Sequence, residues 1–389
     1  MADYIATSTL NGEAILQKEL AELGITESKP ARGKVIFRAS EEEACRAAYF
    51  CRTARKVLMP VRSFRFSSKE DFYEGASSVE WEEMMDISRT FAVRVKGEDA
   101  VLRNSAYSAL LLKDAIVDRL RDKKGRRPDV DKEKPNTMVQ AFLEKGRVSI
   151  SLDLGGSLHK RGYRAESSPG SLNEALAASI LKFCGYCGEE PFLDPMCGSG
   201  TIGIEAALIA GDIAPGLLWR YEKGFFSLPF IPADVKRTIP KMAKERVRRP
   251  AFSIAVSDID GRAVRTSMNN AKRAGVAAFM KFREEDFFSL RPEDGGGLMV
   301  SNLPYGDHVE SGTDLESFYR SVGDKLKRDF MGFRAGLLMG SAELQKSVGL
   351  YAFRKVSLYN GSKEVRLCLY ELYEGSRKAG KGESRQRFS

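Results

Sequence analysis

The stretch Pro191-Phe-Leu-Asp-Pro-Met-Cys-Gly-Ser-Gly-Thr-Ile-Gly203 decides the fold of this chain. A short apolar run reaches an acid at Asp194, glycines follow, and an apolar helical pattern then continues to Ala210. A strand, a tight turn and a helix in this order form the place where α/β sheets bind nucleotides. The segment 198–203 also satisfies the G-x-G-x-x-G pattern, which is weak alone because any tight strand-to-helix turn favours glycine.

The acid at the tip of this strand discriminates between nucleotide-like ligands. A dinucleotide site presents backbone N–H groups to a pyrophosphate, which the carboxylate of Asp194, beside Pro195, would repel. S-adenosyl-L-methionine carries a sulfonium and an ammonium group and no phosphate, so a carboxylate would attract it. The loop therefore favours a methyl donor as its ligand, with Gly198, Gly200 and Thr201 forming the turn around it.

A second motif follows another apolar strand pattern in the stretch Leu298-Met-Val-Ser-Asn-Leu-Pro-Tyr-Gly306. The side-chain oxygen of Asn302 and the backbone carbonyl of Leu303 can both accept hydrogen bonds from an exocyclic amino group. Pro304 fixes its φ angle and holds the turn open, and Tyr305 offers a ring face for a flat base. These four residues are the candidate catalytic residues.

Acids also follow the next two strand patterns. Asp258 is expected to accept hydrogen bonds from both ribose hydroxyls of the cofactor, as acids do at this position, and Asp260 competes for the same role. Asp286 is expected to accept from the adenine amino group, with Phe287 covering the ring. Acids at strand ends also cap helices. Three of them after three successive strands favour a cofactor site.

Composition narrows the class of protein. A chain of 389 residues with 43% apolar content suggests two or three domains with real cores. No run approaches the ~18 to 20 apolar residues of a membrane span, and the start lacks a signal segment. Six scattered cysteines fit a reducing cytoplasm, and the lone pair Cys184 and Cys187 is expected to be structural. With two histidines, no histidine-based metal site is expected, and a net charge of +9 is compatible with a polyanionic partner.

The two motifs, with Arg161-Gly-Tyr-Arg164 upstream and a basic N-terminal half, resemble the THUMP-domain class I RNA methyltransferases over nearly the whole chain. The most similar group is the guanine-N2 enzymes acting on ribosomal RNA or tRNA, the RlmL/YpsC and TrmN group. That family usually has Asn-Pro-Pro-Tyr or Asp-x-Pro-Tyr/Phe. Leu303 departs from the commoner form at little cost, because its useful atom is the backbone carbonyl.

The resemblance and the periodicity together predict an α/β protein with four segments. Residues 1–64 form a ferredoxin-like domain, whose apparent β-α-β-α-β order a short extra strand would complete. Residues 65–163 form a THUMP RNA-binding domain. Residues 164–374 form a Rossmann-like class I methyltransferase domain that uses S-adenosylmethionine, and residues 375–389 form a basic disordered tail.

Basic side chains cluster near residue 120 and just before the methyltransferase segment. A run of cations at a helix end is also explained by solvation and by the helix dipole, so charge alone leaves both interpretations open. The resemblance favours RNA contact. The candidate RNA-binding residues are Arg119, Lys123, Lys124, Arg126, Arg127, Lys160, Arg161 and Arg164.

The reaction predicted from the resemblance is methylation of the exocyclic N2 of a guanosine in 23S ribosomal RNA. A tRNA acceptor-stem guanosine is an alternative substrate, and Asn-x-Pro-Tyr also serves adenine-N6 nucleic-acid and protein-glutamine enzymes. A NAD-dependent oxidoreductase would share the glycine pattern, but it expects an acid about 20 residues beyond the loop, and Asp258 comes far later. A non-catalytic RNA-binding protein would not need the acid set. The sequence does not identify the RNA, the nucleotide or the oligomeric state.

Overall fold

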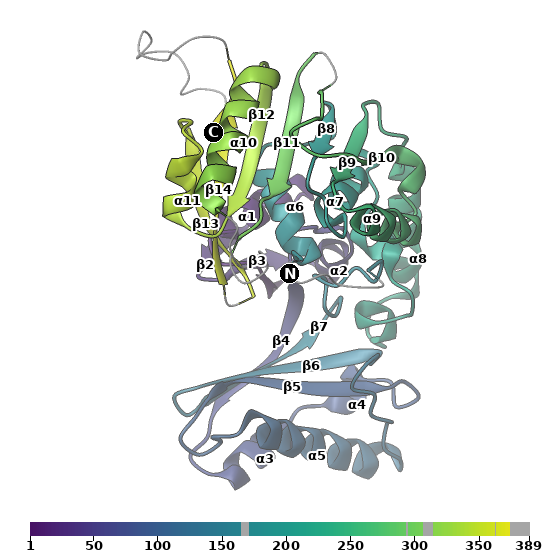
Figure 1. Cartoon of the computed structure of the whole chain (residues 1–389). Coiled ribbons are helices and arrows are strands. Elements are labelled where there is room, and N and C mark those ends of the chain that lie inside the picture. The colour runs from purple at the N-terminus through teal and green to yellow at the C-terminus, as the bar shows by residue number, and fades with distance from the viewer. Residues whose placement is uncertain (165–170, 293–294, 306–313, 362, 374–389) are drawn as a thin grey trace.

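The computed structural model describes residues 1–164, 171–292, 295–305, 314–361 and 363–373. Two seven-stranded sheets organise the chain, one in each half (Figure 1). The first has the order β2-β3-β1-β4-β7-β6-β5 and the second the order β10-β9-β8-β11-β12-β14-β13. No helix within these ranges is long and apolar enough to cross a membrane.

The N-terminal unit has the expected ferredoxin-like rhythm together with the short extra strand. Its elements are β1 (Ala2–Thr7), α1 (Glu13–Glu22), β2 (Ser28–Ala31), β3 (Lys34–Ala39), α2 (Glu41–Phe50) and β4 (Lys56–Arg65). Strand β2 pairs antiparallel with β3 and completes the β-α-β-β-α-β order. Helix α2 begins at a capping box, in which the Ser40 hydroxyl accepts from the Glu43 N–H and the Glu43 carboxylate accepts from the Ser40 N–H.

The second unit shares its sheet with the first. Its elements are α3 (Lys69–Ser77), α4 (Trp81–Met84), β5 (Phe91–Glu98), α5 (Ser105–Lys124), β6 (Thr137–Glu144) and β7 (Arg147–Asp153). Strand β4 pairs with β1 near its start and with β7 along the rest of its length, so it belongs to both units. The divisions expected at residues 64, 163 and 374 therefore stay predictions, and the predicted tail lies outside the described residues.

The C-terminal half is a doubly wound, Rossmann-like sheet with helices on both faces. Its elements are α6 (Glu174–Phe183), β8 (Phe192–Asp194), α7 (Thr201–Ala210), β9 (Ile254–Asp258), α9 (Gly261–Ala274), η3 (Ala277–Phe279), β10 (Met280–Glu284), β11 (Gly297–Asn302), α10 (Leu315–Asp329), β12 (Phe333–Met339), α11 (Ala342–Ser347), β13 (Arg354–Asn360) and β14 (Lys363–Glu371). Strands β8 to β12 run parallel, and β14 is antiparallel to β12. The chain order reverses between β8 and β11, which creates the crevice where such sheets bind ligands.

Strand β8 is a short central strand whose residues are all buried, as is typical of a parallel sheet covered on both faces. Phe192 belongs to the core under α6 and α7, and Leu193 to the core under α10. Helix α7 lies so close to the sheet that a Cβ on Gly203 would come within 2.3 Å of the Val256 Cγ1 atom. The third glycine of the pattern thus permits close helix–sheet packing.

The insertion between α7 and β9 joins the two halves of the molecule. It contains η1 (Pro215–Leu218), η2 (Gly224–Ser227) and α8 (Ala233–Arg246). Phe225 and Ile239 are buried in the core of the first sheet, and a Cβ on Gly216 would lie 2.3 Å from the Tyr49 ring of α2. The insertion therefore packs on the N-terminal unit through its aromatic part, although its later part, from Lys236 to Arg249, is strongly basic.

Candidate active site

Polar side chains gather at the carboxyl ends of adjacent parallel strands. Asp194 ends β8, Asp258 ends β9 and Asn302 ends β11. Asp286 follows the end of β10. Because β8 lies between β9 and β11, the acid of the glycine motif and the asparagine of the second motif stand on neighbouring strands at the same edge of the sheet.

The glycine turn is held to this edge by Asp258. Gly198 and Gly200 have positive φ angles of 51° and 81°. The Gly198 N–H donates to Asp258 Oδ2 at 2.9 Å, and the Asp260 N–H donates to Oδ1 at 3.0 Å. A Cβ on Gly200 would come within 2.1 Å of the Ser267 hydroxyl, so the turn needs glycine there for space as well as for its φ angle.

The structure separates the two acids that compete for the ribose. Asp260 is the N-cap of α9, where its Oδ1 accepts from the Arg262 N–H at 2.8 Å and its side chain is 45% exposed. Capping accounts for this residue. Asp258 instead contacts the glycine turn, which leaves it as the candidate ribose ligand.

Asp194 is buried and incompletely hydrogen-bonded. Its side chain is 1% exposed, and within the described ranges its Oδ1 atom has no hydrogen-bond partner. Burial raises the pKa of this carboxyl to about 8, and the nearby negative charge of Asp258 acts in the same direction. A cationic group bound here would favour the ionised form. Burial also raises the pKa of the Cys197 thiol, which opposes any role for it as a nucleophile.

The Asn-x-Pro-Tyr turn is anchored by its backbone. The Leu303 N–H donates to the Leu338 carbonyl at 3.1 Å, and the Tyr319 hydroxyl donates to the Pro304 carbonyl at 3.1 Å. These bonds fix Asn302 at the sheet edge. Tyr305 is only 8% exposed, and a Cβ on Gly340 would lie 2.8 Å from the Tyr305 Cβ. The expectation of an open ring face is therefore not met in this structure, and stacking on a base requires the ring to become uncovered.

Asp286 and Phe287, which follow β10, were both expected to contact the adenine, and only Asp286 remains a candidate. Asp286 lies at the sheet edge, and its Oδ1 accepts from the Phe288 N–H at 3.1 Å. Phe287 is 3% exposed, and its ring centroid lies 5.8 Å from that of Phe330 in the core. The Phe287 ring is thus occupied by core packing. It is not free to cover an adenine, whereas Asp286 stays a candidate.

Two arginines predicted to bind RNA, Arg161 and Arg164, instead bond to groups within the protein. Arg164 donates to the Thr201 hydroxyl at 3.0 Å, at the start of α7, and also to the Leu172 carbonyl. Arg161 is 2% exposed, and its Nε atom lies 3.4 Å from Glu205 Oε1. The prediction that Arg161 contacts RNA is wrong, because a fully buried guanidinium paired with a buried carboxylate cannot reach a phosphate. Arg164 supports the glycine turn.

The remaining RNA-binding candidates lie at the surface to different degrees. Arg119 forms a two-pronged pair with Glu82, with its Nε 2.9 Å from Glu82 Oε2. The exposed candidates are Lys123, Lys124, Arg126, Arg127 and Lys160. Their contact with RNA stays a prediction.

Two polar residues of α9 that the sequence did not single out also support the glycine turn. The Asn270 side chain donates to the Ser199 carbonyl at 3.0 Å, and Ser267 lies under Gly200. Both are buried. Their spacing of three places them on one helical face with the apolar Ala271 and Ala274, and that pattern could have indicated their position.

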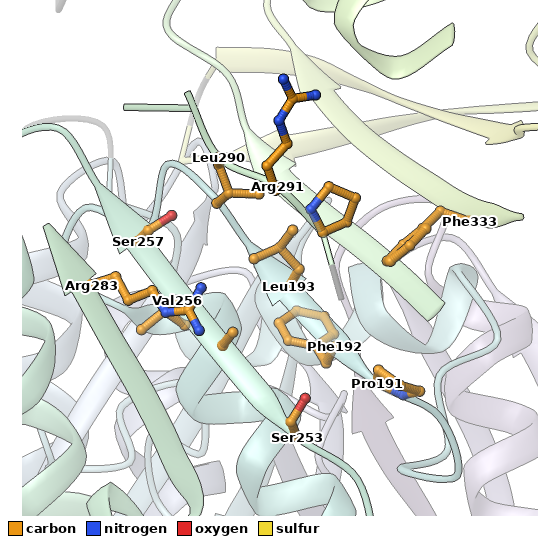
Figure 2. Close-up of a pocket in the computed structure, with 12 residues that line it drawn as sticks. Pro191, Phe192, Leu193, Ser253, Val256, Ser257, Arg283, Leu290, Arg291 and Phe333 are labelled. Carbon is orange, nitrogen blue, oxygen red and sulfur yellow. The ribbon is translucent and has the colours of Figure 1, made fainter. Parts of the chain in front are cut away.

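The pocket drawn in Figure 2 does not coincide with this edge. It lies against β8 and β9 and is lined by Phe192, Leu193, Ser253 and Val256 together with Leu290 and Arg291. Several of these residues belong to the beginnings and middles of the strands, whereas the polar groups above stand at the strand ends. We place the candidate site at the ends because the hydrogen-bonding groups converge there. Across the described ranges, no three His, Cys, Asp or Glu side chains are grouped as metal ligands.

A Rossmann-like sheet with an acid and glycine turn at one strand end and Asn-x-Pro-Tyr at the next defines a methyltransferase. The chain belongs to the RMKL-like methyltransferase family, whose domain model matches residues 161–367. A THUMP domain model matches residues 66–153, and an RlmL ferredoxin-like domain model matches residues 3–58. The resemblance seen in the motifs is therefore confirmed.

Similar proteins extend over almost the whole chain. A "Ribosomal RNA large subunit methyltransferase K/L" from Syntrophotalea carbinolica is 37% identical over 95% of this chain and 54% of that protein. The protein of the same name from Allochromatium vinosum is 36% identical over 96% of this chain and 52% of that protein. This chain thus spans about half the length of these curated relatives.

Solved structures share the complete architecture. SMU.472, a putative methyltransferase complexed with SAH, superposes with a TM-score of 0.85 at 26% identity, covering 96% of this chain and 99% of that one. A predicted N6-adenine-specific DNA methylase from Listeria monocytogenes gives a TM-score of 0.81 at 28% identity, covering 95% and 96%. The Rossmann-like fold and its N-terminal units are therefore established.

Proposed function

We propose that this chain transfers a methyl group from S-adenosylmethionine to the exocyclic N2 of a guanosine in large-subunit ribosomal RNA. The observation that carries the proposal is the position of Asp194 and Asn302 at the ends of the neighbouring strands β8 and β11. A carboxylate suited to the cationic end of the donor then stands beside an acceptor suited to an amino group. The names of the relatives support ribosomal RNA as the substrate. Methyl transfer onto unmodified large-subunit RNA, followed by identification of the product nucleoside, tests the proposal.

The donor would be held by the three strand-end acids. The Oδ1 atom of Asp194, buried without a partner in the described part of the chain, fits the sulfonium and ammonium end of the methionine. Asp258 would accept the ribose hydroxyls while its bond to Gly198 keeps the turn in place. Asp286 would accept the adenine amino group. The donor, when bound, supplies an electrophilic methyl carbon.

The protein's part in the reaction is to orient the base. The guanine amino nitrogen is a poor nucleophile because its lone pair is delocalised into the ring. Hydrogen bonds from its two N–H groups to Asn302 Oδ1 and to the Leu303 carbonyl favour a pyramidal nitrogen and expose the lone pair. A reacting distance of about 3 to 3.5 Å with aligned atoms supplies much of the rate, and the surplus proton leaves to solvent. A base-paired guanosine must first be flipped out of its stack.

Asp258→Ala is expected to weaken donor binding about 5- to 150-fold, which corresponds to about 1 to 3 kcal/mol for ribose hydroxyls left without a charged acceptor. Asp260→Ala is the matched control. It also removes a carboxylate, but from the residue two positions later, which caps α9. It should leave donor affinity nearly unchanged. Isothermal titration calorimetry with S-adenosylmethionine measures both variants, and the opposite ranking would make Asp260 the ribose ligand.

Donor affinity is expected to rise with pH between about 6 and 7.5. The pKa of Asp194 is raised to about 8, so below that pH the carboxyl must release a proton before it can pair with the cationic donor. Donor affinity should increase by up to about tenfold for each pH unit in this range. The range ends at about pH 7.5 because the donor's own amino group begins to lose its positive charge near 7.7–8.0. Asp194→Asn should bind more weakly at pH 7.5 and show a flat profile. A wild-type profile that is flat or falls with pH would contradict this role for Asp194.

A further inference from the structure

Helix α10 contacts both of the segments that the proposed reaction brings together. It packs on one face of the Rossmann-like sheet over β11 and β12 (Figure 1). Tyr319 and Leu326 lie on one stripe of this helix and share a core with Leu303 of the Asn-x-Pro-Tyr turn. The Tyr319 hydroxyl donates to the Pro304 carbonyl at 3.1 Å. This stripe therefore supports the turn that carries Asn302.

A second stripe of α10 contacts the segment after β10. It includes Phe318 and Lys325, which are seven residues apart and so lie on the same side of the helix. The ring centroids of Phe318 and Phe288 lie 5.8 Å apart, with the rings edge to face. The Lys325 Nζ atom donates to the Phe288 carbonyl at 3.0 Å and to the Leu290 carbonyl at 2.7 Å. The helix thus holds this segment by its backbone.

Lys325 is buried, and its bonding capacity is fully used. The residue is 1% exposed, and its third partner is Asp329 Oδ2 at 2.7 Å, one turn later on α10. An ammonium group has three N–H donors, so two carbonyls and one carboxylate satisfy it. An apolar side chain would fill the same space without the cost of burying a charge. The two carbonyl bonds are therefore what the lysine adds, and it acts through the groups that it holds.

The two carbonyls belong to the turn that begins at Asp286. The Ser289 and Leu290 N–H groups both donate to the Asp286 carbonyl at 3.0 Å, and the Phe288 N–H donates to Asp286 Oδ1 at 3.1 Å. Because these bonds close the turn, holding its last carbonyls also fixes the carboxylate at its start. Lys325 thus determines where Asp286 stands relative to α10, and the same helix fixes the Asn-x-Pro-Tyr turn.

We propose that Lys325 is a positioning residue for methyl transfer. Through α10 it holds the segment that binds the donor's adenine at a fixed place relative to the Asn302 turn. The proposal rests on the methyltransferase function and on the adenine contact of Asp286 proposed above. The adenine end of the donor determines where its methyl group lies, and transfer depends steeply on the alignment of that methyl carbon with the target nitrogen.

The first test measures how the full chain recognises the adenine amino group. Calorimetry compares S-adenosylhomocysteine with S-inosylhomocysteine, in which an oxygen replaces that amino group. The parent protein should bind the adenosine form about tenfold or more tightly, because a carboxylate accepts from the amino group. Lys325→Met keeps a long side chain without donors and should reduce this preference to about threefold or less. A loss of stability alone would leave the preference unchanged.

Two further variants control for folding and for charge. Lys325→Met/Asp329→Leu removes both buried charges, so it is expected to fold even if the single variant is unstable. It still leaves the two carbonyls without their donor and should show the same reduced preference. Lys327→Met removes an exposed lysine of the same helix, whose Nζ atom lies 3.4 Å from Asp324 Oδ1. This matched control should keep the parent preference.

The second test measures transfer with donor and ribosomal RNA both saturating. Single-turnover methylation by Lys325→Met should be about tenfold slower than by the parent protein, because misplaced reacting atoms lower the rate even when both substrates are bound. Tyr319→Phe removes the hydroxyl bonded to the Pro304 carbonyl and should slow transfer about threefold or more. It should keep the parent preference for the adenosine form, which separates the two stripes of α10.

The outcomes distinguish this inference from the proposed function. An unchanged preference in Lys325→Met, or an unchanged transfer rate at saturation, overturns the proposal and leaves the function intact. An equal loss of preference in Lys327→Met also overturns it, because the effect would not belong to the buried lysine. Parent protein without the preference contradicts the role of Asp286 and this inference with it. Parent protein that binds neither ligand and transfers no methyl group contradicts the proposed function itself.

Discussion

Replacing Asn302 by alanine is expected to slow single-turnover methyl transfer by a factor on the order of 10²–10³. The side-chain oxygen is a preorganised acceptor at the end of β11, in a turn anchored through Leu303 and Pro304. It acts on the amino group as the nitrogen becomes pyramidal, so its loss raises the barrier more than it weakens ground-state binding. Single-turnover transfer from tritiated S-adenosylmethionine to the ribosomal RNA measures the effect.

Donor affinity provides the control for this variant. Calorimetric binding of S-adenosylmethionine to Asn302→Ala should stay within about threefold of the parent, because the donor contacts proposed above lie on β8, β9 and the segment after β10. Asn302→Asp keeps an acceptor oxygen and should retain more activity than Asn302→Ala. Transfer at the parent rate in Asn302→Ala would show that this turn is not catalytic. Loss of donor binding would assign Asn302 to the cofactor site.

Arg161→Ala is expected to destabilise the protein by about 3–5 kcal/mol, because it leaves the buried carboxylate of Glu205 without its cation. Glu205 lies on α7, directly after the glycine turn, and is fully buried. Arg161 also donates to the carbonyls of Leu158 and Arg52, and the Tyr163 hydroxyl lies 3.2 Å from Glu205 Oε1. This cluster links the N-terminal unit to the helix that supports the donor site.

Differential scanning calorimetry of the full chain measures this effect as a lowered unfolding temperature. The double variant Arg161→Met/Glu205→Leu should recover much of the loss, since both buried charges are then removed. Arg262→Ala, which removes an exposed guanidinium with an 85% exposed side chain, should leave the unfolding temperature unchanged. An unaltered transition in Arg161→Ala would mean that the buried pair does not hold these elements together.

Features with a local physical signal could be predicted from the sequence. The glycine turn, the acid at the end of β8 and the asparagine at the end of β11 follow from short apolar runs that end in polar residues. The incomplete β-α-β-α-β rhythm predicted one short extra strand without placing it, and the structure has it as β2. Parallel strands bring their carboxyl ends to one edge, so distant motifs could be expected to meet.

Side-chain burial could not be predicted in the same way, because it depends on partners far along the chain. Arg161 was predicted to be a surface cation, but in the structure it is buried and paired with Glu205. The rings of Tyr305 and Phe287 were assigned to ligands, but the packing of Gly340 and Phe330 covers them. The insertion was basic in composition, yet its aromatic part packs into the N-terminal core. Charge and residue type indicate what a side chain can bind, whereas tertiary contacts decide what it does bind.

The most direct measurement of the central claim is mass spectrometry of nucleosides from large-subunit ribosomal RNA that the purified protein has methylated with isotopically labelled S-adenosylmethionine. The account predicts labelled N2-methylguanosine in that RNA, and a signal reduced on the order of 100-fold or more with the Asn302→Ala protein. Label in N6-methyladenosine, label in tRNA alone, or no transfer to any RNA would contradict it.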